Sequence, residues 1–150
     1  MSATPAPRGL PRARTGCDLQ RVDVVADAIR DFGARYLDRV YTADEQASYA
    51  VGGASSLAAR FAAKEAVLKL LGTVDGVDLR SIEIRTPDDG PGRPEVHLTG
   101  RAADLARELG ISDAADIDVS LSHTGDLALA VAVSITHPTT EERTESSPHA

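Results

Sequence analysis

The sequence predicts an α+β domain in which a small, mostly antiparallel sheet packs on a central helix. Two observations lead to this fold class. Residues 22–71 carry apolar side chains at helical spacing, whereas residues 80–136 contain short alternating stretches separated by turns. Helices followed by hairpin-connected strands are typical of α+β folds, in which a sheet buries one face against a helix.

Three helices are predicted in the first half of the chain. The first covers residues 22–37. Its apolar stripe consists of Val22, Val25, Ile29, Phe32 and Tyr36. A second helix should begin at Thr42, because Thr42 and Glu45 have the spacing of a capping box, and the Gly52-Gly53 pair should end it. The third helix covers residues 56–71 and should stop at Gly72.

The second half predicts two hairpins around a short helix. The expected elements, in order, are strands at 80–86 and 95–99, a helix at 101–109, and strands at 117–122 and 127–136. Residues 87–92 form a turn by composition, and residues 124–126 should form the second hairpin loop.

The composition indicates one acidic domain with polar ends. Of the 150 residues, 12–136 are expected to form the domain, and the net charge is −7. Residues 1–11 and 137–150 are expected to be disordered, because they hold prolines and polar residues and little to bury. The negative charge argues against non-specific nucleic-acid binding, and no apolar run suits a membrane span or a signal peptide. We therefore expect a cytoplasmic protein.

Two features near the start concern the first strand. Cys17 is the only cysteine, which excludes an internal disulfide and a cysteine-based zinc site, and we expect it to be a small buried residue. The segment Arg12-Ala-Arg-Thr15 lacks apolar alternation. A strand there is expected to be short or frayed.

The helix at residues 56–71 places charges on an apolar arc. At about 100° per residue, Leu57 and Leu71 share one arc with Lys64 between them, and Glu65 lies at its edge. Buried charges are unfavourable unless they are paired, bind a ligand or coordinate a metal. The structural alternative is a surface ion pair between Glu65 and Lys69 at i,i+4.

Three motifs occur in a defined order along the chain. They are Gly16-x-Asp18 near the start, Phe61-x-x-Lys64-Glu65-Ala66-x-x-x-Lys69 in the central helix, and Ser120-x-Ser122-His123-Thr124 before the last strand. With this ordered set, residues 12–136 resemble the holo-acyl-carrier-protein synthase family, the small 4′-phosphopantetheinyl transferases.

The resemblance implies a Mg²⁺-dependent reaction with two substrates. The 4′-phosphopantetheine arm of coenzyme A would be transferred to a serine of an apo acyl carrier protein, and 3′,5′-ADP would leave. The resemblance assigns Asp18 and Glu65 as metal ligands, in keeping with the carboxylate preference of Mg²⁺. Lys64 and Lys69 would contact phosphate oxygens, and one of them would stabilise the transferring phosphoryl group. The serine proton would pass either to a metal-bound water or to Glu65.

The resemblance also implies a homotrimer with sites between subunits. Ser122, His123 and Thr124 would contact the coenzyme A phosphates from a neighbouring subunit, although a lone histidine at a strand end is more often structural. Arg60 has two interpretations, a phosphate contact or a surface residue. The alternative to an enzyme is a non-catalytic module of the same fold that binds coenzyme A or a carrier protein.

Two positions depart from related patterns. Gln20 stands where the larger, surfactin-type transferases have a third acid, so the chain is similar to the small synthases, and water would replace that ligand. Val24 stands where the family usually has a basic residue that meets the carrier protein.

Overall fold

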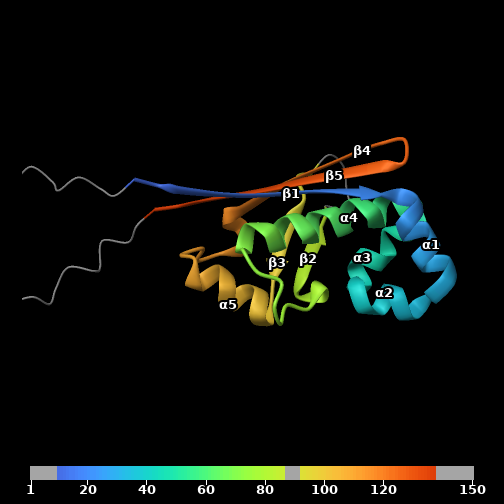
Figure 1. Cartoon of the computed structure of the whole chain (residues 1–150), viewed down its shortest axis with the longest axis horizontal. Coiled ribbons are helices and arrows are strands. Elements are labelled where there is room, and N and C mark those ends of the chain that lie inside the picture. Colours follow the sequence, from blue (N-terminus) through green and yellow to red (C-terminus); the bar gives the residue numbers. More distant parts are fainter. Residues whose placement is uncertain (1–9, 87–91, 138–150) are drawn as a thin grey trace, which may run out of the picture.

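The computed structural model describes residues 10–86 and 92–137, and its elements confirm the α+β class (Figure 1). The disorder expected at the two ends of the chain and the turn expected at 87–92 fall almost entirely outside the described residues. Among the helices in the described ranges, none is long and apolar enough to cross a membrane.

Three antiparallel strands form the main sheet, with the last strand of the chain in the middle. Their order is β1 (Arg12–Arg21), β5 (Leu127–Thr136) and β4 (Ile117–Thr124). All of β1 pairs with β5, from Arg12 opposite Thr136 to Arg21 opposite Leu127. The prediction of a short or frayed first strand is therefore wrong, because ladder hydrogen bonds join backbone groups and do not require apolar alternation.

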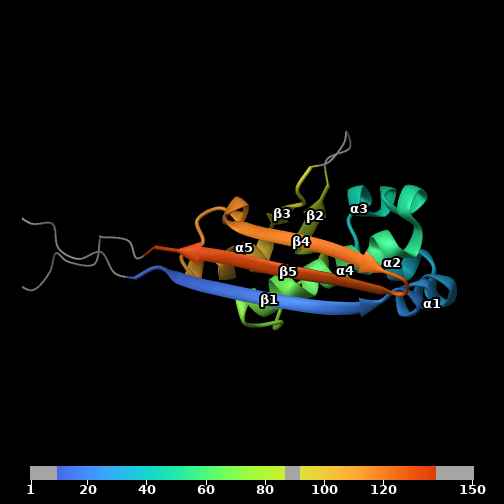
Figure 2. The same ribbon diagram turned by 90° about the horizontal axis from the view of Figure 1, so that it is seen from above.

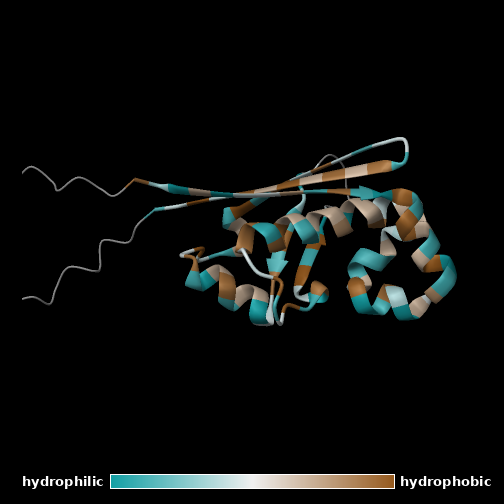
Figure 3. Cartoon of the chain, in the orientation of Figure 1, coloured by the Kyte–Doolittle hydropathy of each residue, from teal (hydrophilic) through white to brown (hydrophobic). Residues whose placement is uncertain are grey.

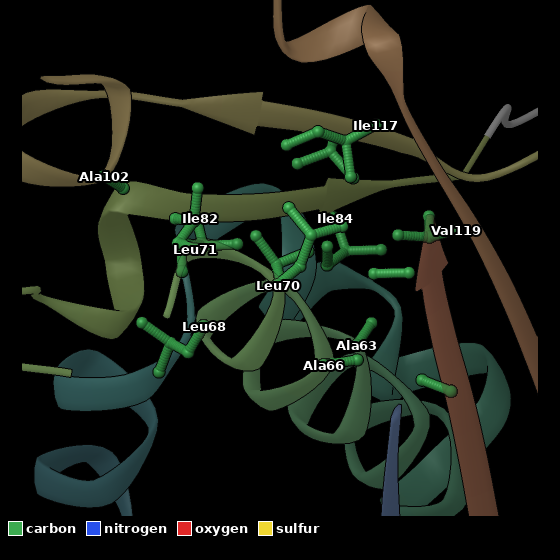
Figure 4. Packing of buried hydrophobic residues seen from close by; sticks show 14 of the residues in the cluster. Ala63, Ala66, Leu68, Leu70, Leu71, Ile82, Ile84, Ala102, Ile117 and Val119 are labelled. Carbon is green, nitrogen blue, oxygen red and sulfur yellow. The ribbon is translucent and has the colours of Figure 1, made fainter. Parts of the chain in front are cut away.

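The central helix α4 (Tyr49–Leu71) lies against one face of this sheet (Figure 2). The break predicted at Gly52-Gly53 is a kink, with Gly53 at φ 60° and ψ −156°. The helix ends at Gly72 as predicted, in the left-handed conformation that glycine adopts without strain. Small residues let helix and sheet approach closely. They include Ala63 and Ala66 of α4 (Figure 4). Ala62 of α4 and Ala130 and Ala132 of β5 belong to the same buried cluster.

Three short helices precede α4 and cover its N-terminal end. They are α1 (Val22–Phe32), α2 (Ala34–Val40) and α3 (Ala43–Ala47). The single helix predicted over 22–37 is wrong, because Gly33 has a φ of 53° and ends α1. Phe32, a member of the predicted apolar stripe, is 60% exposed. The capping box at Thr42 and Glu45 is confirmed, with both reciprocal hydrogen bonds present.

A two-stranded hairpin and a helix complete the core. The hairpin consists of β2 (Ile82–Arg85) and β3 (Glu95–Leu98), followed by α5 (Gly100–Glu108). Two 3₁₀ turns, Leu79–Ser81 and Ala114–Asp116, precede β2 and β4. Ile82 and Ile84 of the hairpin pack against Leu70 and Leu71 of α4 (Figure 4). Both hairpins predicted from the sequence are therefore confirmed.

The strands of the main sheet include many hydrophobic residues (Figure 3). Several of those on the face away from α4 are exposed. Leu19 of β1 lies opposite Leu129 of β5, and Cys17 lies opposite Val131. All four are exposed, so the expectation that Cys17 is buried is wrong. Side chains alternate along a strand, and this register directs Gly16 and Asp18 to the helix side and Cys17 to the other face. We call Leu19, Leu129, Val131 and Ile135 the outer sheet patch.

Candidate active site

Asp18 and Lys69 meet where β1 crosses the C-terminal half of α4. The Lys69 ammonium donates to Asp18 Oδ1 at 2.8 Å and to the backbone oxygen of Cys17 at 2.8 Å. The ion pair that the structure describes for Lys69 is therefore with Asp18 and not with Glu65, which does not support the surface pair between Glu65 and Lys69. The hydrogen bond to Asp18 raises the pKa of Lys69, so its ammonium stays charged at neutral pH.

Gly16 sets the distance between β1 and α4. A Cβ atom at Gly16 would lie 1.9 Å from the Ala66 carbonyl oxygen and 2.8 Å from the Leu70 nitrogen, so only glycine fits here. Asp18 follows two residues later and faces the same side of β1. The glycine of the Gly-x-Asp motif therefore brings the aspartate to the helix that carries Glu65 and Lys69.

Glu65 is half-buried on α4 within electrostatic range of Asp18. Burial raises the pKa of Glu65, the Asp18 carboxylate raises it further, and Lys69 opposes both effects. A cation bound to both carboxylates would offset the unfavourable effect of Asp18 on the charged form of Glu65. Mg²⁺ needs few protein ligands because water and phosphate oxygens fill its octahedron, so the Asp18–Glu65 pair fits this ion. The described residues contain no cluster of three or more metal-ligating side chains.

The structure does not bring Lys64 to this pair. Its side chain is fully buried, and its ammonium lies 2.8 Å from Glu45 Oε2 and donates to the carbonyl oxygens of Leu79 at 2.9 Å and Ile82 at 2.6 Å. The expectation that Lys64 contacts a phosphate does not match this placement. Sequence reasoning identified the buried charge but missed its partner. That partner is Glu45, the glutamate of the predicted capping box. A capping-box glutamate is held at the N-terminus of its helix, and this fixed position was the available signal.

Arg60 lies in a different part of the molecule, in a cavity of about 650 Å³. We call this space the Arg60 cavity. It lies between α3, the N-terminal half of α4 and the end of β2, and its lining includes Asp44, Ser48, Ser56, Arg60, Arg85 and Thr86. Arg60 is mostly buried, so it is not a surface residue. Its guanidinium donates to Ser56 Oγ and Thr86 Oγ1, both at 2.7 Å, while Nε has no hydrogen-bond partner among the residues that the structure describes.

Ser122, His123 and Thr124 form the exposed end of β4. His123 lies opposite Ala128 of β5, which in turn lies opposite Gln20, so it is on the same face as Asp18. The middle strand separates β4 from β1 by about 10 Å. Ser122 and Thr124 alternate to the opposite face. Within one chain, the structure therefore brings together Asp18, Glu65 and Lys69, but not the Ser-His-Thr segment.

Comparisons with known proteins show the family of this chain. The 4′-phosphopantetheinyl transferase superfamily matches residues 14–132. A holo-[acyl-carrier-protein] synthase from Chloroflexus aurantiacus is 41% identical over 136 residues, covering 79% of this chain and 94% of that protein. The crystal structure of the Neisseria meningitidis holo-[acyl-carrier-protein] synthase has 30% identity and a TM-score of 0.68, covering 84% of this chain and 98% of its own. The structure of the Plasmodium yoelii acyl carrier protein synthase with ADP bound has 26% identity and a TM-score of 0.70. The match covers 85% of this chain and 98% of that chain.

The fold and the matched range define a small α+β transferase. The chain belongs to the 4′-phosphopantetheinyl transferase superfamily. The resemblance found from the three motifs is thereby confirmed.

Proposed function

We propose that this chain is a cytoplasmic holo-acyl-carrier-protein synthase that uses Mg²⁺. It transfers the 4′-phosphopantetheine arm of coenzyme A to a serine hydroxyl of an apo acyl carrier protein and releases 3′,5′-ADP. The observation that carries the proposal is the junction of Asp18, Glu65 and Lys69, where two carboxylates and an ammonium from separate elements meet. The curated relatives named holo-[acyl-carrier-protein] synthase support the reaction.

The reaction joins the serine oxygen to the phosphorus that carries pantetheine and breaks the bond from that phosphorus to 3′,5′-ADP. Asp18 and Glu65 would hold Mg²⁺, which neutralises charge on the pyrophosphate. A lysine ammonium has three donors, and Lys69 uses two of them on Cys17 and Asp18. Its third N–H can therefore donate to an oxygen of the transferring group, where charge stabilisation matters most. Two acceptors for the serine proton are compatible with this geometry, the Glu65 carboxylate and a water molecule.

The Arg60 cavity is proposed to hold a phosphate at the nucleotide end of coenzyme A. Its charged lining side chains are Arg60, Arg85 and Asp44. The unpartnered Nε of Arg60 is a buried donor, and such donors are costly unless an acceptor arrives. A phosphate oxygen is an acceptor that suits a guanidinium.

A homotrimer is proposed to complete the site. Within residues 10–86 and 92–137 nothing covers the outer sheet patch, and an apolar sheet face is normally packed against another layer. We propose that neighbouring copies cover this patch, and that the exposed β4 end of one copy reaches the site of the next. Ser122, His123 and Thr124 would then contact phosphates bound by the neighbouring chain, which one chain alone does not achieve.

The alternative is a non-catalytic module that binds the same partners. The presence of Asp18, Glu65 and Lys69 in one junction favours the enzyme. The test is to incubate the full chain with coenzyme A, Mg²⁺ and a panel of apo carrier proteins, and to follow each carrier by mass spectrometry. Addition of one phosphopantetheine supports the enzyme. Binding of coenzyme A without any addition would favour the module.

A further inference from the structure

Glu45 connects three segments of the chain through one buried carboxylate. It is 1% exposed and belongs to α3. Its Oε2 accepts the backbone N–H of Thr42 at 2.9 Å and lies 2.8 Å from the Lys64 ammonium of α4. Its Oε1 accepts the backbone N–H of Ile84, in β2, at 2.8 Å. A carboxylate can accept several hydrogen bonds at once, so this one ties α3, α4 and β2 together.

Lys64 has no donor left for a substrate. Its three N–H groups are accounted for by Glu45 and by the carbonyl oxygens of Leu79 and Ile82. The ammonium also lies 5.9 Å from the centre of the Tyr41 ring, a favourable cation–π position. The side chain is fully buried, so a phosphate could reach it only if this network opened.

The three segments joined by Glu45 are also the three walls of the Arg60 cavity. On α3, Asp44 lines the cavity next to Glu45 in sequence. On β2, Ile84 lines the cavity, and Arg85 and Thr86 follow it. On α4, Arg60 stands one helical turn before Lys64.

We propose that Glu45 and Lys64 are positioning residues for coenzyme A binding in the Arg60 cavity. Their buried pair holds the three walls at the spacing that places Arg60 Nη2 2.7 Å from Thr86 Oγ1. Neither side chain touches the substrate. The inference rests on the proposed function of the Arg60 cavity, and it assigns to Lys64 a role different from a phosphate contact.

The two roles predict different kinetics. A residue that contacts the transferring phosphoryl group changes the rate of transfer from bound coenzyme A. A residue that only places the cavity walls changes the affinity for coenzyme A and leaves the rate at saturation nearly unchanged. A small shift of the walls is enough to misalign several contacts.

The test compares Glu45→Gln, Lys64→Met and the double variant with the parent chain. Each is titrated calorimetrically with coenzyme A and with 3′,5′-ADP, and single-turnover transfer is measured at saturating coenzyme A and Mg²⁺. We expect affinity to fall about tenfold or more, while the saturated rate stays within about threefold. The double variant leaves no unpaired buried charge, so it carries the test if the single variants do not fold.

Two controls separate the possible failures. Ile111 is buried in the core and does not line the Arg60 cavity. The coenzyme A affinity of Ile111→Val should equal that of the parent even though its melting temperature falls. Arg60→Ala reports on the cavity itself. If Arg60→Ala loses affinity and the Glu45 and Lys64 variants do not, the positioning role is wrong and the cavity assignment stands. If none of these variants loses affinity for coenzyme A, both the positioning role and the assignment of the Arg60 cavity are wrong. If the Lys64 variant transfers much more slowly at saturating coenzyme A but binds coenzyme A as tightly as the parent, the inference is overturned. Lys64 would then be assigned to a phosphate contact.

Discussion

Lys69 Nζ and Asp18 Oδ1 lie 2.8 Å apart although 51 positions separate the two residues in the sequence. The contact joins the strand that begins the domain to the helix at its centre. It depends on the close approach of β1 to α4, and it brings one member of each of two motifs into one place.

Gly16→Ala should damage both the fold and the site. The new methyl group would lie 1.9 Å from the Ala66 carbonyl oxygen, so β1 must move away from α4. Overpacking of this kind costs ~1–3 kcal/mol of unfolding free energy. Transfer should fall by more than stability alone explains, because Asp18 moves with the strand. Chemical denaturation and single-turnover transfer measure the two effects. Thr15→Ala, on the other face of β1, is the stability control, and equal behaviour of the two variants would contradict the close-approach argument.

Glu65→Gln should change stability in a pH-dependent way in the absence of metal. Because the pKa of Glu65 is raised from 4.5 by burial and by Asp18, the native state holds this proton more tightly than the unfolded chain does. The protonated Glu65 side chain adds to the free energy of unfolding. This contribution is complete below the pKa of Glu65 in the unfolded chain, and it is lost as the pH rises through the pKa of Glu65 in the folded chain. The variant should therefore match the parent at about pH 4 and exceed it near pH 7. Denaturant unfolding in a chelator measures this, and a difference that is constant with pH would contradict it.

Leu129→Lys should dissociate the proposed trimer. Leu129 belongs to the outer sheet patch and lies opposite Leu19, and a buried ammonium without a partner is strongly unfavourable. Light scattering after size exclusion should give about three times 15.7 kDa for the parent and a single 15.7 kDa chain for the variant. Val74→Lys is the matched control, because Val74 is exposed in a loop outside the patch. A parent chain that is monomeric and fully active would exclude a site shared between subunits.

Lys69→Ala should slow transfer but keep its dependence on Mg²⁺. The variant removes the ammonium proposed to contact the transferring group, and leaves both carboxylates in place. We expect roughly a hundredfold slower single-turnover transfer, ~2.7 kcal/mol of barrier. Lys69→Arg, which keeps the charge, should recover part of the rate. A Lys69→Ala chain that no longer responds to Mg²⁺ would place Lys69 in metal binding rather than at the phosphate.

The sequence predicted most elements whose signals are local. The capping box at Thr42 and Glu45, the glycine stop at Gly72 and both hairpins depend on neighbouring residues, and all are present. Gly33 lay inside an apolar helical stripe, so periodicity hid the break that its positive φ produces. The full length of β1 depends on pairing with a strand more than a hundred residues away, which no local pattern contains.

The candidate site could be predicted in part for the same reason. The resemblance assigned Asp18, Glu65 and Lys69 to one site, and the structure places Lys69 in contact with Asp18 and on the same helix as Glu65. The close approach at Gly16 that permits this contact is visible only in the structure. The motif also named Lys64, but its direction on the helix depends on Glu45, Leu79 and Ile82, which lie on three other segments. Spacing along one helix cannot distinguish a buried partner from a bound phosphate.

The central claim is that Asp18 and Glu65 act together through one metal ion. Single-turnover transfer should be measured against Mg²⁺ concentration for Asp18→Ala, Glu65→Ala and the double variant. The account predicts that each single variant loses at least about a thousandfold, ~4 kcal/mol of barrier. It also predicts that the double variant is little worse than either, because groups that act as a unit are not additive. A Glu65→Ala chain with near-normal rate and Mg²⁺ response would contradict the account.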